Sequence, residues 1–342
     1  MNANDTKTVE RVSVNDAPLI PGLSFRYFQG DEDYPAILEV NRASKIADGL
    51  EHDLHTLDTI THAYGTTPNH NPYRDVLIAE VNGKVVAFTR VFWERELDGP
   101  RVYLHFGFVV PEWRGKGLGR AMIRWSEGRA REIEAEQPHE GVAEIMSGAY
   151  SSMPGLQHLL KAEGYEAVRY SYHMETPDLD HIPDVPMPEG LEVRPARPEH
   201  YRAIWEASAE AFRDHWGASE IRDEDFERWL TNPIFQPELW MVAWDGEQVA
   251  GSILNYINRN YNELIGRKLG YTESISVRRP WRKRGLARAL LARSMKLHKD
   301  QGMTQTALGV DAQNPSGALR LYESMGYKVL SESTTYRKPL QG

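Results

Sequence analysis

Two short glycine-containing turns are the parts of this sequence best suited to chemistry. The first reads R-x-x-G-x-G from Arg114 to Gly119, and the second reads R-x-x-G-x-A from Arg282 to Ala287. Small residues let a backbone approach a ligand closely, and the first amides of a following helix present free N–H groups with partial positive charge. Such a turn can bind a pyrophosphate. One copy could equally be a helix start that needs tight packing, but two copies in the same context favour ligand binding.

The spacing of the turns excludes two common nucleotide sites. A dinucleotide-binding fingerprint needs its third glycine three residues after the second, and Arg120 occupies that position. Neither copy continues into the Gly-Lys-Ser/Thr of a nucleoside-triphosphate loop. The turns are flanked by cations, namely Arg114, Lys116, Arg282, Lys283 and Arg284. We therefore expect a nucleotide-like ligand whose reactive end lies away from the turn.

The elements that must position these turns occur twice. Two apolar runs, at 75–93 and 239–257, are each divided by a hairpin signal, Asn82-Gly83 in the first and Asp245-Gly246 in the second. Strand-like runs from Val102 and Tyr271 lead into the two turns, and an amphipathic helix follows each turn. Trp113 and Trp281 are separated by 168 residues, as are Gly117 and Gly285. The sequence is therefore an internal repeat.

The repeat predicts a mixed α/β fold of two tandem domains, each with a mixed, mostly antiparallel sheet flanked by helices. Four prolines in 176–190 suit an extended connector between the copies. We expect a disordered leader over 1–22, an N-terminal domain over 23–175, this linker, and a C-terminal domain over 191–342. A length of 342 residues also favours two cores over one.

These turns resemble the [RQ]-x-x-G-x-[GA] motif of the GCN5-related N-acetyltransferase superfamily. The stretch from Asp311 to Val329 resembles the superfamily's downstream strand–helix motif. The resemblance implies acetyl-CoA as co-substrate, with its pyrophosphate at the turns and its pantetheine and acetyl carbonyl at strand amides. The implied contacts are Ile275, Ser276, Val277, Arg282, Lys283, Arg284, Gly285, Leu286, Ala287 and Asn314 in the second copy, and Val109, Arg114, Gly115, Gly117 and Gly119 in the first. Asn314 could equally serve only as a cap of its turn.

Acetyl transfer to an amine needs a base for the amine and an acid for the leaving thiolate. Glu273 is the candidate base, and Tyr271 lies on the same strand face as a candidate substrate contact. Alternatively, Glu273 pairs with an arginine across the sheet. Tyr322 matches the superfamily's general-acid tyrosine and stays protonated at neutral pH. Its alternative role is that of a core aromatic residue.

The first copy departs from this pattern. Aligning Gly164 with Gly326 places Leu160 opposite Tyr322 and Ser152 opposite Asn314, so the acid is missing. A constant offset of 168 places His105 opposite Glu273. We expect one competent site, in the C-terminal domain, and an N-terminal domain that is structural or regulatory and could still bind acetyl-CoA.

The acceptor side is less clearly marked. Asp214, His215 and Trp216 are candidates for acceptor contact in the second copy. His52, His55, His62 and His70 have irregular spacing and no cysteine beside them, so we expect no metal and place them over the acceptor groove of the first copy.

Composition limits the partners. The formal net charge of −9 argues against nucleic acid, and no apolar stretch is long enough for a membrane helix. The absence of cysteine excludes an acyl-cysteine intermediate. We expect a cytoplasmic monomer or homodimer that acetylates a primary amine of a small molecule by direct transfer. The alternatives are a non-catalytic acetyl-CoA sensor or scaffold and a protein or peptide N-acetyltransferase.

Overall fold

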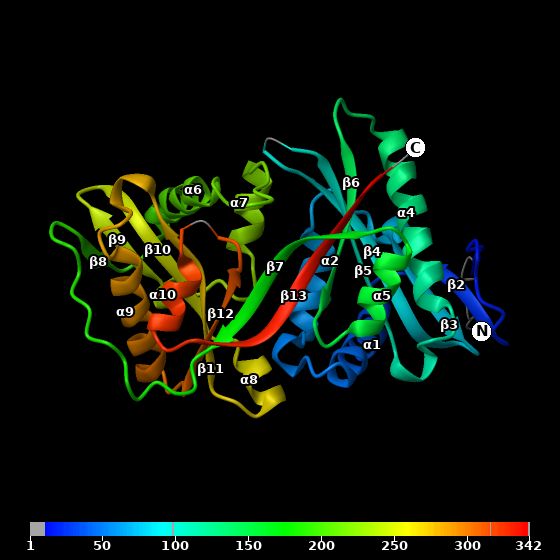
Figure 1. Ribbon diagram of the computed structural model, residues 1–342, viewed down its shortest axis with the longest axis horizontal. Helices are drawn as coiled ribbons and strands as arrows, with labels where there is room; N and C mark the ends of the chain where they lie inside the picture. Colours follow the sequence, from blue (N-terminus) through cyan, green and yellow to red (C-terminus); the bar gives the residue numbers. More distant parts are fainter. Residues whose placement is uncertain (1–10, 98, 315, 341–342) are drawn as a thin grey trace, which may run out of the picture.

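The computed structural model describes residues 11–97, 99–314 and 316–340. Within them, the strands form one sheet in the order β1-β2-β3-β4-β5-β6-β13-β7-β12-β11-β10-β9-β8. Each half of this sheet is built from one sequence copy, except that the last strands, β7 and β13, are exchanged between the halves. Figure 1 shows the two halves side by side. The mixed α/β class and the tandem arrangement are as predicted. No helix in these ranges is long and apolar enough to cross a membrane.

The N-terminal half holds the first copy. Its strands are β1 (Arg11–Val12), β2 (Leu23–Tyr27), β3 (Val76–Val81), β4 (Lys84–Arg95), β5 (Arg101–Val109), β6 (Ala143–Tyr150) and β7 (Glu166–Glu175). Its helices are α1 (Tyr34–Ala47), α2 (Leu57–Thr66), α3 (Pro72–Asp75), α4 (Leu118–Glu136) and α5 (Pro154–Ala162). Asn82 and Gly83 have positive φ, which closes the predicted β3–β4 hairpin.

The C-terminal half repeats this order. Its strands are β8 (Glu192–Arg194), β9 (Met241–Asp245), β10 (Gln248–Tyr256), β11 (Leu269–Val277), β12 (Gln305–Asp311) and β13 (Lys328–Pro339). Its helices are α6 (Tyr201–Phe212), α7 (Asp223–Leu230), α8 (Arg259–Ile265), α9 (Leu286–Asp300) and α10 (Ala318–Ser324). Gly117 and Gly285 both adopt a left-handed conformation immediately before α4 and α9, which is why glycine occupies these helix starts.

The last strand of each copy pairs with a strand of the other. β13 lies between β6 and β7, and β7 lies between β13 and β12. In Figure 1 these two strands run together across the middle of the molecule. Met174 of β7 packs in the core of the C-terminal half, while Tyr336 of β13 packs with Ile145 and Leu160 in the N-terminal half. The two copies are therefore joined by shared strands.

Two of the predicted segments are packed. Residues 11–22 of the expected leader include β1, which pairs with β2, and Val14, which is buried. The leader prediction is therefore wrong for these residues, because their apolar side chains cover the edge of the first core; residues 1–10 lie outside the described ranges. The proline-rich segment 176–190 forms no helix or strand. It lies against α9, where Arg293 donates a hydrogen bond to the Val185 carbonyl at 2.8 Å.

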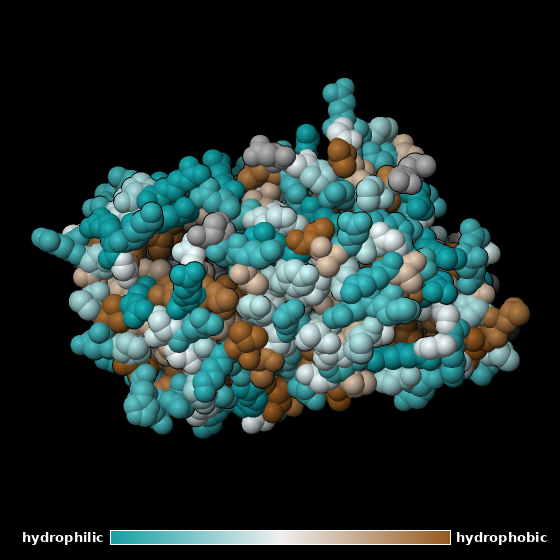
Figure 2. Space-filling view, viewed as in Figure 1, coloured by the Kyte–Doolittle hydropathy of each residue, from teal (hydrophilic) through white to brown (hydrophobic). Residues whose placement is uncertain are grey.

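The outer surface is polar where Figure 2 shows it. Hydrophilic residues dominate this face, and hydrophobic residues appear as scattered groups. The apolar side chains instead form separate cores in each half, on both sides of the shared sheet. We therefore expect the ligand sites where neighbouring strands of the sheet separate from each other.

Candidate active site

A β-bulge interrupts β11 in the C-terminal half. Leu254 of β10 faces Glu273, and Ser252 faces Ser276, so Ser274 and Ile275 together oppose the single residue Ile253. Ser274 has a positive φ of 49°, which is uncommon for a residue with a side chain. A bulge re-aims the neighbouring side chains and disrupts the ladder locally. Glu273 directly precedes this disruption.

The same strand separates from its other neighbour. β11 pairs with β12 only at Leu269, Gly270 and Tyr271, whereas β12 continues to Asp311 alongside β7. From Thr272 onward, this edge of β11 has no ladder partner among the described residues. Backbone groups at Ile275 and Val277 therefore border the opening at which the resemblance places the thioester.

The carboxyl group of Glu273 belongs to a partly buried side chain. Burial raises its pKa to about 7, against a smaller opposing effect of the Ser274 backbone. No ion pair to Glu273 occurs within the described residues, so an arginine partner across the sheet is not part of this structure. A carboxyl group with this pKa exists in both protonation states near neutral pH, as a general base requires.

Tyr322 lies on α10 and is 6% exposed. Its ring packs against Tyr327 with centroids 6.2 Å apart. Burial raises the pKa of Tyr322, and the charges of Tyr327 and Glu273 raise it further. Tyr322 is therefore a protonated phenol at neutral pH.

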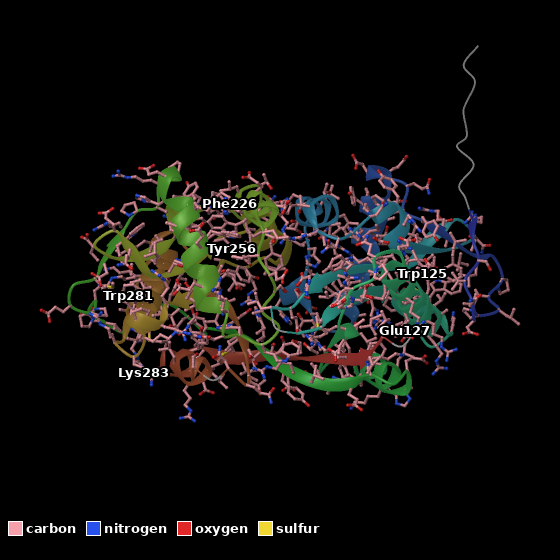
Figure 3. The ribbon with its side chains drawn as sticks, turned by 90° about the horizontal axis from the view of Figure 1, so that it is seen from above. Trp125, Glu127, Phe226, Tyr256, Trp281 and Lys283 are labelled. Carbon is pink, nitrogen blue, oxygen red and sulfur yellow. The ribbon has the colours of Figure 1, made fainter. Side chains whose placement is uncertain are left out.

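Glu273 and Tyr271 line a cavity of about 420 Å³ between the two halves. Tyr256 stacks on Tyr271 with ring centroids 4.7 Å apart, and Tyr261 donates from its hydroxyl to the Glu51 carbonyl at 2.7 Å. The N-terminal half contributes His52, Asp53, Leu54, His55, Thr59, His62, Ala63, Tyr150 and His173 to the same wall. Figure 3 shows Tyr256 well inside the C-terminal half, while Lys283 lies at its outer edge.

Sequence reasoning missed this shared wall. We expect the four histidines over the acceptor groove of the first copy. His55 lines both the cavity of the first copy and the cavity that contains Glu273, His52 and His62 line only the latter, and His70 lines neither. Tyr150 and His173 carry no motif that could have singled them out. They reach the cavity because the two halves share β7 and β13, and the sequence gives no signal of that exchange.

The candidate acceptor residues of the second copy lie elsewhere. Asp214 forms ion pairs with Arg279 and Arg282. Trp216 lies under the guanidinium groups of Arg169 and Arg337, 5.7 and 4.3 Å from its ring. Neither these two residues nor His215 belongs to the cavity beside Glu273.

The arginine that opens each turn braces the turn. Arg282 donates from Nε to the Val277 carbonyl at 2.9 Å and from Nη1 to Asp214 at 2.7 Å. Arg114 repeats both contacts, with the Val109 carbonyl at 3.1 Å and Asp48 at 2.6 Å. These side chains fix the end of the strand against a helix. The turn amides, rather than the arginine side chains, are thus the groups free to meet a phosphate.

The turn of the C-terminal half has space beside it. A Cβ atom added at Gly285 would meet no heavy atom within 4 Å, and the same is true at Gly115. At Gly117 it would come within 3.2 Å of Pro18, so the N-terminal segment lies against the first turn. Asn314 accepts a hydrogen bond from the Ser316 amide at 2.8 Å, which closes the turn before α10, whereas the N-cap residue of α10 is Gly317.

The first copy differs at the catalytic position. Val109 faces Ala87 as Val277 faces Gly251, but β5 pairs with β4 without any register shift. When the two strands are aligned at Val109 and Val277, Phe106 faces Arg90 at the position where Glu273 faces Leu254. The extra residue of the bulge therefore makes Phe106, not His105, the equivalent of Glu273. The prediction for His105 is therefore wrong, because a constant offset of 168 cannot hold across a bulge. His105 is buried and bonds to the Tyr165 hydroxyl at 2.9 Å.

A second cavity, of about 1070 Å³, opens in the N-terminal half. It is bordered by the turn residues Arg114, Gly115, Gly117 and Gly119 and by the separating ends of β5 and β6. Asp53, His55 and Tyr150 line both this cavity and the one beside Glu273. The two cavities are therefore neighbours.

Comparison with known proteins agrees with this geometry. The model of the acetyltransferase (GNAT) family matches residues 36–137 and 201–327. Mycothiol acetyltransferase of Geodermatophilus obscurus is 26% identical over 78% of this chain and 82% of its own length. The Salinispora tropica protein of that name is 26% identical over 89% and 93%. The two tandem copies, with the more complete motif in the second copy, predict a similarity to mycothiol synthase. The relatives named mycothiol acetyltransferase confirm this similarity.

Solved structures show the same fold. A GCN5-related N-acetyltransferase from Sphaerobacter thermophilus superposes with a TM-score of 0.74 and 28% identity, over 95% of this chain and 98% of its own. A tandem GNAT protein from the clavulanic acid biosynthesis pathway gives a TM-score of 0.68 at 15% identity, over 94% and 99%. Two matched regions, one in each half, cover most of the sequence. The chain therefore belongs to the acetyltransferase (GNAT) family and is an N-acetyltransferase with two tandem copies of the fold.

Proposed function

We propose that this enzyme transfers acetyl from acetyl-CoA directly to a primary amine of a small molecule, and that the reaction takes place in the C-terminal half. The observation that carries the proposal is the position of Glu273. It is a carboxyl group with a pKa of about 7, it directly precedes a bulge where β11 separates from β12, and it faces a cavity. The equivalent position in the N-terminal half is Phe106, which cannot take up a proton.

In the proposed reaction, Glu273 takes up a proton and Tyr322 gives one up. An alkyl ammonium group has an ordinary pKa near ~10, so the ionised Glu273 carboxylate removes a proton from the amine. The amine nitrogen then bonds to the acetyl carbon, and the carbon–sulfur bond breaks. Tyr322 gives its phenolic proton to the departing thiolate, and the attacking nitrogen loses its second proton to the resulting Tyr322 phenolate. The proton held by Glu273 then passes to solvent. Free backbone amides at the bulge would stabilise the charge that develops on the carbonyl oxygen.

The cavity beside Glu273 supports a small acceptor. Its volume of about 420 Å³ is in the range of small-molecule sites. Its walls come from both halves, and stacked tyrosines lie beside neutral polar groups such as Asn258. The relatives named mycothiol acetyltransferase also carry the name of a small molecule. A lysine-bearing peptide would need an open groove instead.

A screen of amines tests the proposal. Release of free CoA from acetyl-CoA would be followed with amino sugars, aminoglycosides, polyamines and lysine peptides as acceptors. We expect turnover with at least one small amine and slower turnover with peptides. If acetyl-CoA raises the melting temperature but no amine releases CoA, the sensor alternative is the better description. If peptides are the preferred acceptors, the protein acetyltransferase alternative holds.

A further inference from the structure

The large cavity of the N-terminal half carries one unbalanced charge. Three of its cations are held in ion pairs: Lys45 with Asp53 at 2.7 Å, Arg114 with Asp48 at 2.6 Å, and Arg120 with Glu163 at 2.8 Å. The remaining cation of the lining is Arg90, which makes no ion pair within the described residues. A cavity with this balance attracts an anion.

Arg90 lies on β4 and is 3% exposed. Its Nη2 donates to the Thr67 hydroxyl at 3.0 Å, while its Nε has no hydrogen-bond partner. The neighbouring carboxylate Asp75 is bound to Arg129 at 2.8 Å, and both of those side chains are buried. Asp75 attracts Arg90 electrostatically, but its ion pair is with Arg129. A buried guanidinium without a counter-ion is costly, and a bound anion removes that cost.

Aromatic rings fix the orientation of this guanidinium. Its carbon lies 4.5 Å from the ring centre of Tyr64, 5.1 Å from that of Phe92 and 5.3 Å from that of Phe106. The rings partly compensate the positive charge but supply no hydrogen-bond acceptor in the plane of the guanidinium. Its planar N–H fork matches a carboxylate, which can accept two parallel hydrogen bonds.

Two further polar groups of the cavity also lack partners. The Tyr64 hydroxyl and the Asn41 Oδ1 atom are buried without a hydrogen bond, and both residues line the cavity. The hydroxyl can donate to an anion, and the amide oxygen can accept from an N–H or O–H group of the same molecule. Buried polar groups are normally satisfied, so these three residues supply donors and an acceptor that a ligand of the cavity could engage.

The corresponding positions of the two halves have opposite chemistry. Arg90 faces Phe106 on β4 and β5, whereas Leu254 faces Glu273 on β10 and β11. The C-terminal half therefore has a carboxyl group, Glu273, on β11. The N-terminal half has a phenylalanine at that position and a cation, Arg90, on the paired strand β4. The first copy is thus not simply a weakened version of the second, because its polar groups suit a different ligand.

We propose that the N-terminal cavity binds a small molecule through its carboxylate, with Arg90 and the Tyr64 hydroxyl as the anion receptor. The site is separate from the turn at Gly115 and Gly117. Phe106, the neighbour of Arg90, lies three residues before Val109 on β5, which is about 10 Å along the strand. A pyrophosphate at the turn and a carboxylate at Arg90 could therefore be bound at the same time.

Calorimetric titration of the full chain tests this site. The probes are succinate, its neutral counterpart succinamide, and inorganic phosphate. We expect succinate to bind and succinamide not to bind. Arg90→Leu, which introduces the residue of the equivalent position in the other half, should weaken succinate binding at least about tenfold. Tyr64→Phe should weaken it by about three- to tenfold and keeps the charge, so it remains informative if Arg90→Leu does not fold.

Two control variants separate this site from its surroundings. Arg120→Gln removes a cation that lines the same cavity but is already paired with Glu163, and Glu273→Gln alters the other cavity. Both should leave succinate binding unchanged. The proposal is overturned if succinamide binds as well as succinate, if Tyr64→Phe and Arg90→Leu bind succinate normally, or if Glu273→Gln abolishes binding. Equal binding of phosphate would overturn the assignment to a carboxylate.

Discussion

Glu273 and Phe106 occupy the same position on corresponding strands of the two halves, and the residues that follow them differ in number. One extra residue in the bulge at Ser274 separates Glu273 from Val277, whereas β5 runs regularly from Phe106 to Val109. The half with the bulge also carries the carboxyl group. The backbone irregularity and the proposed base therefore occur together, in one half of the molecule.

Replacing the proposed base should abolish most of the activity. Glu273→Gln keeps the shape of the side chain but cannot take a proton from the amine, so kcat should fall about 10²-fold or more. Steady-state CoA release at pH 7 measures this effect, with the melting temperature as the control for folding. A variant that retains the wild-type kcat would remove Glu273 from the mechanism.

The pKa of about 7 for Glu273 predicts the pH dependence of the rate. Protonated Glu273 cannot act as a base, so kcat/KM should fall as the pH drops below about 7, with the slope of a single ionisation. The Glu273→Gln variant should lack this ionisation. The profile should be recorded with an amine acceptor whose own ionisation is known, because amine protonation also lowers the rate. An identical acidic limb in the variant would assign the ionisation to another group.

The raised pKa of Glu273 also predicts how the stability of the protein depends on pH. Stability should change with pH in the opposite direction to the rate. The pKa of Glu273 is raised by folding, so the folded protein holds this proton more tightly than the unfolded chain does. Stability should therefore be lost as the pH rises from about 4.5 to about 7, because ionising the buried carboxyl group is costly. Glu273→Gln should gain in melting temperature relative to wild type over this range. Equal pH dependence of the two proteins contradicts this expectation.

The two tyrosines of the second core should respond differently to loss of the hydroxyl group. Tyr322→Phe should lower kcat by about 10²-fold with little change in the KM for acetyl-CoA, because the proton for the thiolate is lost. Tyr327 is the matched control, since its hydroxyl is bonded to Thr306 at 2.7 Å and to Thr272 at 3.2 Å. Tyr327→Phe should cost about 1 kcal/mol of stability but retain kcat. Equal kinetic loss in both variants would indicate a structural role for Tyr322.

Separation of the two copies should fail to give two independent domains. A fragment ending at residue 175 lacks β13, and a fragment starting at residue 191 lacks β7, so each leaves a sheet edge unpaired. We expect each fragment alone to aggregate or to show little tertiary structure, and the coexpressed pair to form a 1:1 complex. Size-exclusion chromatography and circular dichroism measure both outcomes. Two well-folded, monomeric fragments would show that the shared strands are dispensable.

Much of the fold was predictable because it depends on local patterns. The hairpin signals, the glycine turns and the amphipathic helices were placed by residue types that act over a few positions. Glu273 is a predicted base because it lies on the strand before the second turn, on the face shared with Tyr271, where the superfamily resemblance implies such residues. The bulge at Ser274 was not predictable, since nothing in the residue type of a serine indicates a positive φ. As a result, the comparison of His105 with Glu273 was off by one residue.

The cavity between the halves could not be predicted for a different reason. His52, Tyr150 and Tyr271 are far apart in the sequence and meet only because β13 enters the first half of the sheet. Strand pairing across more than a hundred residues leaves no periodic signal. The unpaired state of Arg90 was equally hidden, because the sequence does not reveal which carboxylates are already occupied.

The side-by-side passage of β7 and β13 restricts how this enzyme can move. Many two-lobed enzymes open and close about a flexible hinge, but here any such rotation would have to break the pairing of β7 with β13, which runs from Lys328 to Arg337 with two register shifts. Acceptor entry and product release must therefore depend on loops and side chains at the mouth of each cavity, while the distance between the two ligand sites stays fixed. A molecule bound at one site would then influence the other through their common wall rather than through rearrangement of the lobes.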